Sequence, residues 1–133
     1  MNTPTRPAVV DQATLDWECW SDPTLASRSA IRWKLLITGE RTASRGLVTG
    51  VAQLAPGAHL LPHRHEPEET YYIVSGRGEM EIDDDTTAVG PGCAIYIPAN
   101  ACHALRCTGP EPLLFVFSFA RDRFDQIKYH LVQ

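Results

Sequence analysis

Three histidines and one glutamate carry the clearest potential for chemistry in this sequence: His63, His65, Glu69 and His103. Side chains two residues apart on a β-strand point to the same face, so His63 and His65 share one side of their strand. If that side is the interior of the domain, three imidazoles and a carboxylate converge on one point. Neutral imidazole and carboxylate suit a divalent first-row transition metal, and iron, nickel, manganese, cobalt, copper and zinc are all candidates.

The spacing of these residues resembles the two sequence signatures of the cupin superfamily. The first signature sets two histidines and a glutamate between two glycines, here Gly57, His63, His65, Glu69 and Gly76. The second sets a glycine and a proline before a histidine, here Gly92, Pro98 and His103. The resemblance covers about residues 46–118. It implies a compact antiparallel barrel in which His63, His65, Glu69 and His103 are the metal ligands.

Two positions depart from the second signature. Asn100 stands where the family has glycine, and Cys107 stands where the family has an asparagine four residues after the histidine. Asparagine tolerates a left-handed backbone better than most residues, so we expect the turn at Asn100 to be preserved. The position of Cys107 is not one of the usual ligands, so the ligand set is unaffected, although a thiol near the metal could alter the redox sensitivity of the site.

Two tyrosines are the candidate catalytic residues. Tyr71 lies two residues beyond Glu69 and therefore on the same strand face. A phenol has an ordinary pKa of about 10, but a neighbouring cation lowers that pKa and allows the phenolate to act as a general base. The alternative is an interior aromatic side chain hydrogen-bonded to a neighbour. Tyr71 and a second tyrosine, Tyr129 in the segment Asp125 to Tyr129, are similar in placement to residues of the small cupin lyases that cleave dimethylsulfoniopropionate. That resemblance implies that Tyr71 is the base and Tyr129 an auxiliary group in the pocket.

Three functions fit these residues. The favoured one is a metal-dependent lyase or isomerase, in which a small carboxylate chelates the metal at positions that the protein leaves open and then loses its α-proton to a base. Dimethylsulfoniopropionate is a candidate substrate by the resemblance above. The second is an iron-dependent dioxygenase that uses the same ligands. The third is a non-catalytic small-molecule binding or sensor module.

The stretches that must position these residues have the alternating polar and apolar pattern of short β-strands. Polar and apolar side chains alternate over residues 31–35, and Leu113, Phe115, Phe117 and Phe119 share one face of a later stretch. Turn residues rich in glycine and proline recur about every 8–12 residues, which is typical of a β-sandwich or barrel. The pattern predicts an all-β domain with a helical turn only within residues 121–128. With the family resemblance, the expected fold is a single-domain cupin, a double-stranded β-helix or jelly-roll barrel.

The length of 133 residues fits one domain. We expect residues 1–24 to form an N-terminal arm that packs on the barrel or on a partner subunit. Residues 25–133 should form the barrel, with a C-terminal segment at 120–133. Trp17 and Trp20 in the arm, together with Trp33, are candidates to line a pocket for a sulfonium through cation–π attraction, or else to pack as core and interface.

Composition argues against two classes of function. Twelve basic and sixteen acidic residues give a net charge of −4, which disfavours nucleic-acid binding through phosphate neutralisation. The longest apolar run, residues 113–117, is far shorter than the ~20 residues that cross a bilayer. The N-terminus has no apolar stretch suited to a signal peptide, so we expect a cytoplasmic protein with reduced cysteines. The tendency of small cupins to pair implies a homodimer to which the N-terminal segment contributes.

Overall fold

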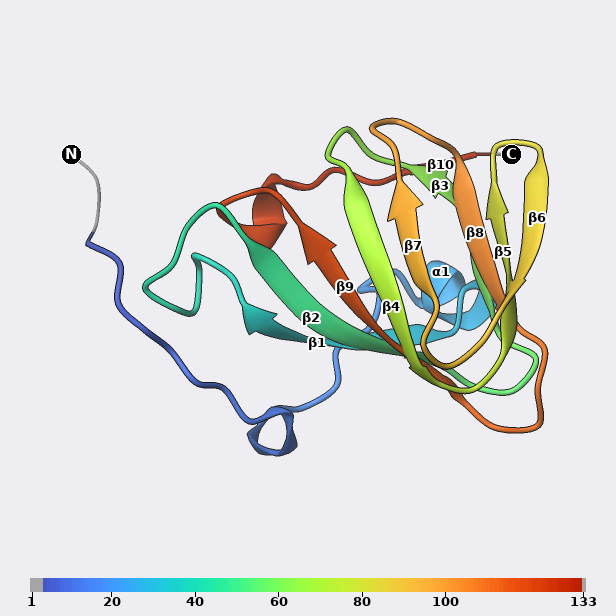
Figure 1. The fold of residues 1–133 in the computed structure, drawn as a ribbon, viewed down its shortest axis with the longest axis horizontal. Helices are drawn as coiled ribbons and strands as arrows, with labels where there is room; N and C mark the ends of the chain where they lie inside the picture. The colour runs from blue at the N-terminus through green and yellow to red at the C-terminus, as the bar shows by residue number, and fades with distance from the viewer. Residues whose placement is uncertain (1–3, 133) are drawn as a thin grey trace.

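A computed structural model describes residues 4–132 of the chain and shows two five-stranded antiparallel sheets that face each other (Figure 1). The first sheet has the order β1 (Ile31–Ile37), β2 (Val48–Leu54), β9 (Leu113–Phe119), β4 (Glu69–Ser75), β7 (Ala94–Ile97). The second has the order β10 (His130–Leu131), β3 (His59–Arg64), β8 (His103–Cys107), β5 (Gly78–Ile82), β6 (Asp85–Val89). The chain passes repeatedly from one sheet to the other, as in a jelly roll. The predicted all-β jelly-roll barrel is confirmed.

Within the described residues, three short helical elements lie outside the sheets: η1 (Gln12–Thr14), α1 (Pro23–Arg28) and η2 (Phe124–Gln126). The last of these falls in the stretch that the sequence predicts. Helix α1 was not predicted, although its start carries an ordinary signal. The Asp22 side chain accepts hydrogen bonds from the backbone N–H groups of Thr24 and Leu25, at 2.9 and 3.3 Å, and Pro23 occupies the first turn. A capping aspartate followed by proline favours a helix start.

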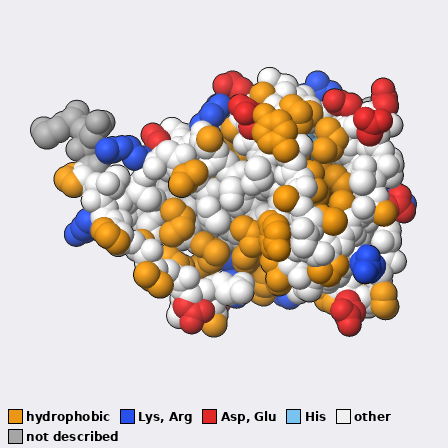
Figure 2. Space-filling view, viewed as in Figure 1, with side chains coloured by type: hydrophobic (Ala, Val, Ile, Leu, Met, Phe, Trp, Pro, Cys, Tyr) orange, Lys and Arg blue, Asp and Glu red, His pale blue; other side chains and the backbone are white. Residues whose placement is uncertain are grey.

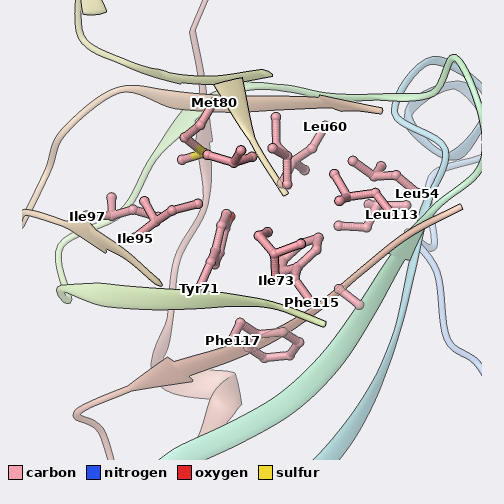
Figure 3. Packing of buried hydrophobic residues seen from close by; sticks show 14 of the residues in the cluster. Leu54, Leu60, Tyr71, Ile73, Met80, Ile95, Ile97, Leu113, Phe115 and Phe117 are labelled. Carbon is pink, nitrogen blue, oxygen red and sulfur yellow. The ribbon is translucent and has the colours of Figure 1, made fainter. Parts of the chain in front are cut away.

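The space between the sheets is filled by apolar side chains that alternate along the strands. On β9, Leu113, Phe115, Phe117 and Phe119 are buried while the residues between them are half-buried. Figure 3 shows Tyr71 and Ile73 of β4 pointing into the same interior, towards Leu60 and Met80. Strand β4 therefore turns the side chains of Glu69, Tyr71 and Ile73 towards the core.

Strand register brings the chemical residues of different strands together. His63 and His103 are directly opposite each other on the antiparallel pair β3 and β8. In the other sheet, Glu69 at the start of β4 is paired with Phe119 of β9 and Ile97 of β7. These positions all lie at strand ends, so one end of the barrel holds the candidate ligands.

The turn before β8 has the left-handed conformation that its residue type allows. Asn100 has a φ of 62°, and its backbone N–H donates to the carbonyl oxygen of His65 at 2.9 Å. The expectation that asparagine preserves this turn is confirmed. The hydrogen bond also fixes the backbone of His65 against the loop that leads to His103.

The N-terminal residues run along the first sheet. Glu18 pairs with Trp33 of β1 through two backbone hydrogen bonds of 2.7 and 2.9 Å. The part of the expected arm at residues 1–3, and residue 133 of the expected C-terminal segment, lie outside the described residues. Within residues 4–132, no helix has the length and apolar character needed to cross a membrane.

The outer face of the first sheet carries apolar side chains, visible as orange atoms in Figure 2. Tyr72 and Val74 of β4 are 51% and 46% exposed, and Tyr96 of the neighbouring β7 is 59% exposed. The inner face of the same strands is buried. This sheet therefore has apolar residues on both sides.

Candidate metal centre and its cavity

Three histidines form a compact buried cluster at one end of the barrel. His63 belongs to β3, His65 follows β3 directly, and His103 begins β8. One ligand atom from each of the three lies within 4.8 Å of the others. Their exposed fractions are 3%, 1% and 0%. The structure thus brings together the three histidines that the sequence singles out.

Each imidazole is oriented by a backbone carbonyl at its Nδ1 atom. The Nδ1 atoms of His63, His65 and His103 lie 2.7, 2.9 and 2.9 Å from the carbonyl oxygens of Leu61, Pro67 and Ala101. A carbonyl oxygen only accepts, so each Nδ1 donates, and a neutral imidazole then carries its lone pair on Nε2. Such a second partner is the usual way in which a protein prepares histidine for metal binding.

His63 is kept uncharged by its surroundings. Burial, and next the neighbouring His103, lower the pKa of His63 to about 3. A neutral imidazole has one ring nitrogen with an available lone pair, whereas a protonated imidazole has none. His63 is therefore in the state that binds a metal.

Glu69 faces this cluster from the opposite sheet. Its Oε1 atom lies 3.0 Å from Nε2 of His65 and 3.5 Å from Nε2 of His103, and the residue is 5% exposed. Nε2 of His103 has no hydrogen-bond partner among the described residues. The contact between Nε2 of His65 and Glu69 is a hydrogen bond when that ring carries a second proton. With neutral rings, the Nε2 lone pairs face the carboxylate, and a cation between them relieves the repulsion. The donor set of three imidazoles and one carboxylate therefore fits a divalent transition metal.

Both candidate catalytic tyrosines border the cluster. The ring centroid of Tyr71 is 6.3 Å from that of His103, and the ring of Tyr129 is 5.6 Å from His63 and 5.4 Å from His65. Neither phenol hydroxyl makes a hydrogen bond within residues 4–132. The alternative of a hydrogen-bonded interior Tyr71 is therefore not what the structure shows, and both hydroxyls are available to a ligand.

Burial and charge act on the two phenols in the same direction. Burial, followed by the charge of Glu69, raises the pKa of Tyr71 well above its ordinary value. The same two causes raise the pKa of Tyr129. Both phenols are protonated in the protein alone. A cation beside Glu69 would offset its negative charge and act in the opposite sense.

A cavity of about 410 Å³, its mouth included, leads to this cluster. Its wall includes the polar side chains of His63, Glu69, Tyr71 and Tyr129. The rest of the wall is rich in aromatic rings: Trp20, Ile31, Trp33, Ala52, Leu60, Phe115, Phe117 and Phe124. None of these described lining residues is lysine or arginine. The cavity therefore combines a few polar side chains with aromatic faces, and the indole N–H groups of Trp20 and Trp33 have no hydrogen-bond partner among the described residues.

The three tryptophans of the sequence hypothesis have different positions. Trp20 and Trp33 pack edge to face with centroids 5.3 Å apart, and both line the cavity. Trp17 lies on the outer side of the sheet, where the Arg32 guanidinium and the Lys34 ammonium are 4.5 and 4.7 Å from its ring. The inclusion of Trp17 in the pocket was therefore wrong, because its ring packs against Arg32 and Lys34 of β1 and does not line the cavity.

Two further features differ from the sequence interpretation. Phe124 lines the cavity and contacts both Trp33 and Tyr129, at centroid distances of 6.3 and 6.2 Å, yet no motif marks it. Cys107 is four residues along β8 from His103, or ~13 Å at the usual rise per residue. Its thiol donates to the Glu111 carbonyl at 3.2 Å. Cys107 is thus too distant to touch the histidine cluster.

Two facing sheets with buried histidines at one end define the class of protein. The chain belongs to the cupin family, and the family described as Cupin domain matches residues 50–119, which include all four candidate ligands. Over 128 residues the chain is 38% identical to dimethylsulfoniopropionate lyase DddW of Ruegeria pomeroyi, a match that covers 96% of this chain and 82% of that enzyme. The resemblance to cupins and to these lyases is therefore confirmed.

A second curated relative has a different activity. The chain is 35% identical over 69 residues to 5-nitrosalicylic acid 1,2-dioxygenase of a Bradyrhizobium species, covering 52% of this chain and 33% of that protein. Lyase and dioxygenase relatives therefore both match this chain.

Solved structures confirm the fold. The polyketide cyclase RemF from Streptomyces resistomycificus superposes with a TM-score of 0.78 at 23% identity, covering 96% of this chain and 87% of that one. A structure described as that of dimethylsulfoniopropionate lyases, RdDddP and RnDddQII, has a TM-score of 0.71 at 24% identity, covering 89% of this chain and 62% of that one. At these identities the likeness concerns the fold alone.

Proposed function

We propose that this cupin is a metal-dependent lyase that cleaves dimethylsulfoniopropionate, or a small analogue of it, to dimethyl sulfide and acrylate. The observation that carries the proposal is the 38% identity to dimethylsulfoniopropionate lyase DddW over 96% of this chain. That match extends well beyond the family motif at residues 50–119. It therefore includes wall segments of the cavity as well as the candidate ligands.

In this proposal His63, His65, Glu69 and His103 hold one divalent transition metal. The support is the arrangement of their lone pairs and the burial of all four side chains. When bound, the metal supplies Lewis acidity that favours a chelated carboxylate and a more acidic α C–H bond. The choice among iron, nickel, manganese, cobalt, copper and zinc depends on geometry and supply more than on these ligand types.

Tyr71 is the proposed general base and Tyr129 the auxiliary group. The phenolate oxygen of Tyr71 would take the proton from the α-carbon, while the electron pair of that C–H bond forms the new C=C bond. The C–S bond then breaks and its electron pair leaves on sulfur, which gives dimethyl sulfide and acrylate. Tyr129 lies against His63 and His65, where its hydroxyl can orient the substrate carboxylate.

The cavity favours a small zwitterion over a simple anion. A substrate carboxylate can accept hydrogen bonds from the hydroxyls of Tyr71 and Tyr129 and from the unpaired indole N–H groups of Trp20 and Trp33. The faces of Trp20, Trp33 and Phe124 attract a sulfonium or a similar cation by cation–π interaction. A molecule that carries both a carboxylate and an onium group therefore matches both kinds of lining.

An anaerobic assay tests the proposal. Protein reconstituted with each candidate metal is incubated with dimethylsulfoniopropionate without oxygen, and dimethyl sulfide and acrylate are measured. We expect both products in equal amounts, at a rate that chelation of the metal abolishes. Absence of both products with every metal, at full metal occupancy, would refute the lyase proposal.

An iron-dependent dioxygenase is the second candidate, and the match to 5-nitrosalicylic acid 1,2-dioxygenase favours it. Such an enzyme consumes oxygen stoichiometrically with its substrate, whereas the lyase reaction needs none. Turnover that requires both iron(II) and oxygen would select this candidate. Tight ligand binding without turnover under either condition would instead indicate the sensor function.

The cellular setting belongs to the same proposal. We propose a homodimer that works on a small molecule in the cytoplasm, with reduced cysteines. All four cysteines are free thiols in the structure, as expected of a protein in a reducing compartment.

A further inference from the structure

Tyr129 is placed by a segment that lies outside the main strands of the barrel. It follows the 3-10 turn η2 (Phe124–Gln126) and precedes the two-residue strand β10, which pairs with β3. Figure 1 shows η2, in red, beside the loop that joins β1 and β2, residues 38–47. We call this loop the β1–β2 loop. The position of Tyr129 therefore depends on what holds η2.

The carboxylate of Glu40, in the β1–β2 loop, caps the start of η2. Its Oε1 atom accepts from the Phe124 N–H at 3.1 Å, and its Oε2 atom accepts from the Asp125 N–H at 3.0 Å. The buried Thr38 hydroxyl donates to the same carboxylate and accepts from the Phe124 N–H at 2.9 Å. The first N–H groups of a helical turn have no partner within it, so a remote carboxylate satisfies them well.

The backbone of the β1–β2 loop lies directly against the same segment. The Gly39 N–H donates to the Asp122 carbonyl at 2.8 Å, and the Gly46 N–H donates to the Asp122 side chain at 2.7 Å. A Cβ atom on Gly39 would lie 2.7 Å from the Asp122 carbonyl oxygen and 2.9 Å from a carbon of Arg123. Such close approach shows that loop and segment are fitted to each other.

Arg41, the next residue of the loop, binds the N-terminal segment that contributes Trp20 to the cavity wall. Both terminal nitrogens of Arg41 donate to the Glu18 carboxylate, at 2.8 and 3.1 Å. Glu18 lies two residues before Trp20, whose ring is 5.5 Å from that of Tyr129. Glu40 and Arg41 thus tie the two cavity-lining segments, one N-terminal and one C-terminal, to one loop.

We infer that Glu40 is a positioning residue, which caps η2 and thereby holds Phe124 and Tyr129 at the cavity beside the histidine cluster. Glu40 itself does not line the cavity, and it contacts the lining residue Phe124 only at its backbone N–H. It acts through the chain of contacts from η2 to Tyr129, whose ring lies 6.2 Å from that of Phe124. Its effect on turnover rests on the proposed lyase function, but its effect on the segment does not.

Hydrogen exchange measured by mass spectrometry tests the inference on the metal-loaded protein. In Glu40→Ala, we expect the amides of residues 124–132 to exchange about tenfold faster, the change expected when hydrogen bonds to a charged group are lost. Glu40→Gln, which keeps one carbonyl acceptor, should fall between Glu40→Ala and the wild type. Glu79→Ala is the matched control, because Glu79 is an exposed glutamate on β5. Metal content should be unchanged in all three variants.

Unchanged exchange of residues 124–132 in Glu40→Ala would overturn the inference, as would an equal increase throughout β3 and β8. A double-mutant cycle with Tyr129→Phe then tests the route to the reaction. If Glu40 acts through Tyr129, Glu40→Ala lowers kcat about tenfold in the wild type and by less than about twofold in the Tyr129→Phe background. Losses that multiply in the double variant would refute that route. A wild-type protein without lyase activity would refute the proposed function, and the exchange result would still decide the role of Glu40.

Discussion

The imidazoles of this site are arranged by backbone carbonyls of their own loops. His63 and His103 each donate from Nδ1 to the carbonyl two residues earlier, and His65 donates to the carbonyl two residues later. No other side chain is needed to set the ring orientation. The local sequence around each histidine therefore determines which nitrogen is free, while the neighbouring strands determine where that nitrogen points.

Removal of one candidate ligand should abolish tight metal binding. In His103→Ala and Glu69→Ala we expect the metal affinity to fall by more than ~100-fold, since even groups that only orient a ligand contribute ~10–100-fold. The β-sheet circular dichroism should be kept. Elemental analysis after gel filtration measures the metal content, with His59→Ala on the neighbouring strand β3 as control. Full occupancy in both ligand variants would contradict the assignment.

Replacement of Tyr71 by phenylalanine separates metal binding from chemistry. Tyr71→Phe keeps the ring that packs on Phe115 at 4.5 Å but removes the hydroxyl. We expect full metal content and a loss of at least ~100-fold in kcat for dimethylsulfoniopropionate cleavage, the usual scale of general-base catalysis. Tyr72→Phe, on the outer face of the same strand, serves as control. Retained turnover in Tyr71→Phe would show that another group removes the proton.

At the level of elements, the site depends on strands that meet at one end of two sheets. Strands β3 and β8 pair in a register that sets His63 opposite His103, with an irregularity between Leu60 and His63. Such an irregularity changes the direction of a strand near a functional site. Strand β4 supplies Glu69 and Tyr71 from the other sheet. Short connecting segments then add the aromatic wall.

The cap on η2 should make part of the stability depend on pH. Hydrogen bonds from Thr38, Phe124 and Asp125 outweigh partial burial and hold the pKa of Glu40 below its ordinary value of 4.5. A group with a depressed folded-state pKa stabilises the protein above its unfolded pKa and loses this contribution as the pH falls through the folded one. We expect Glu40→Gln to lower the free energy of unfolding at pH 7 by about 1 kcal/mol, as for other helix caps.

The same comparison at low pH provides the check. The difference between wild type and Glu40→Gln should shrink progressively as the pH falls below 4.5, and urea unfolding at several pH values measures it. Glu79→Gln should show no such trend. A difference that grows on acidification would contradict the role of the Glu40 carboxylate.

At the level of the whole molecule, the barrel buries its inner face and leaves apolar residues on the outer face of one sheet. Tyr72, Val74 and Tyr96 are each about half exposed there, and Figure 2 shows hydrophobic side chains gathered over this face. The N-terminal residues, which were expected to pack on the barrel or on a partner subunit, pair with β1 of their own chain at Glu18 and Trp33. The sheet face is therefore the stronger basis for self-association.

We predict a homodimer that this face helps to form. Light scattering after gel filtration should give twice the chain mass of 14.7 kDa. The double variant Tyr72→Ser/Tyr96→Ser should shift the mass towards the monomer at low micromolar concentration and keep its metal. Thr86→Ser/Thr87→Ser on the exposed β6 is the control pair. A monomeric wild type would refute the dimer, and an unchanged dimer in the double variant would refute this face.

Much of the candidate site was accessible from the sequence because its information is local. His63, His65, Glu69 and Tyr71 lie within nine residues of each other. Strand alternation is enough to place His63 with His65, and Glu69 with Tyr71, on a shared face of their own strand. His103 was found by its own signature. Helix α1 was missed although its start at Asp22 and Pro23 is also local, since six residues give little periodicity to detect.

The remaining features depend on contacts between distant parts of the chain. Glu40 caps Asp125 across 85 positions, and nothing near Glu40 in the sequence indicates this partner. Trp17 packs against Arg32 and Lys34 of β1, whereas Trp20 and Trp33 line the cavity. This difference also depends on tertiary contacts. Such contacts join residues that are far apart in the sequence, so the neighbours of each residue along the chain do not reveal them.

The sequence by itself determined the residue types of the candidate metal site, the family and the all-β architecture, since motif spacing and strand periodicity are properties of short stretches. The tertiary structure alone decided which aromatic rings form the cavity, how Glu69 meets the histidines from the opposite sheet, and which loop holds Tyr129. Those arrangements depend on packing two sheets and two terminal segments against each other, and packing is a property of the closed barrel.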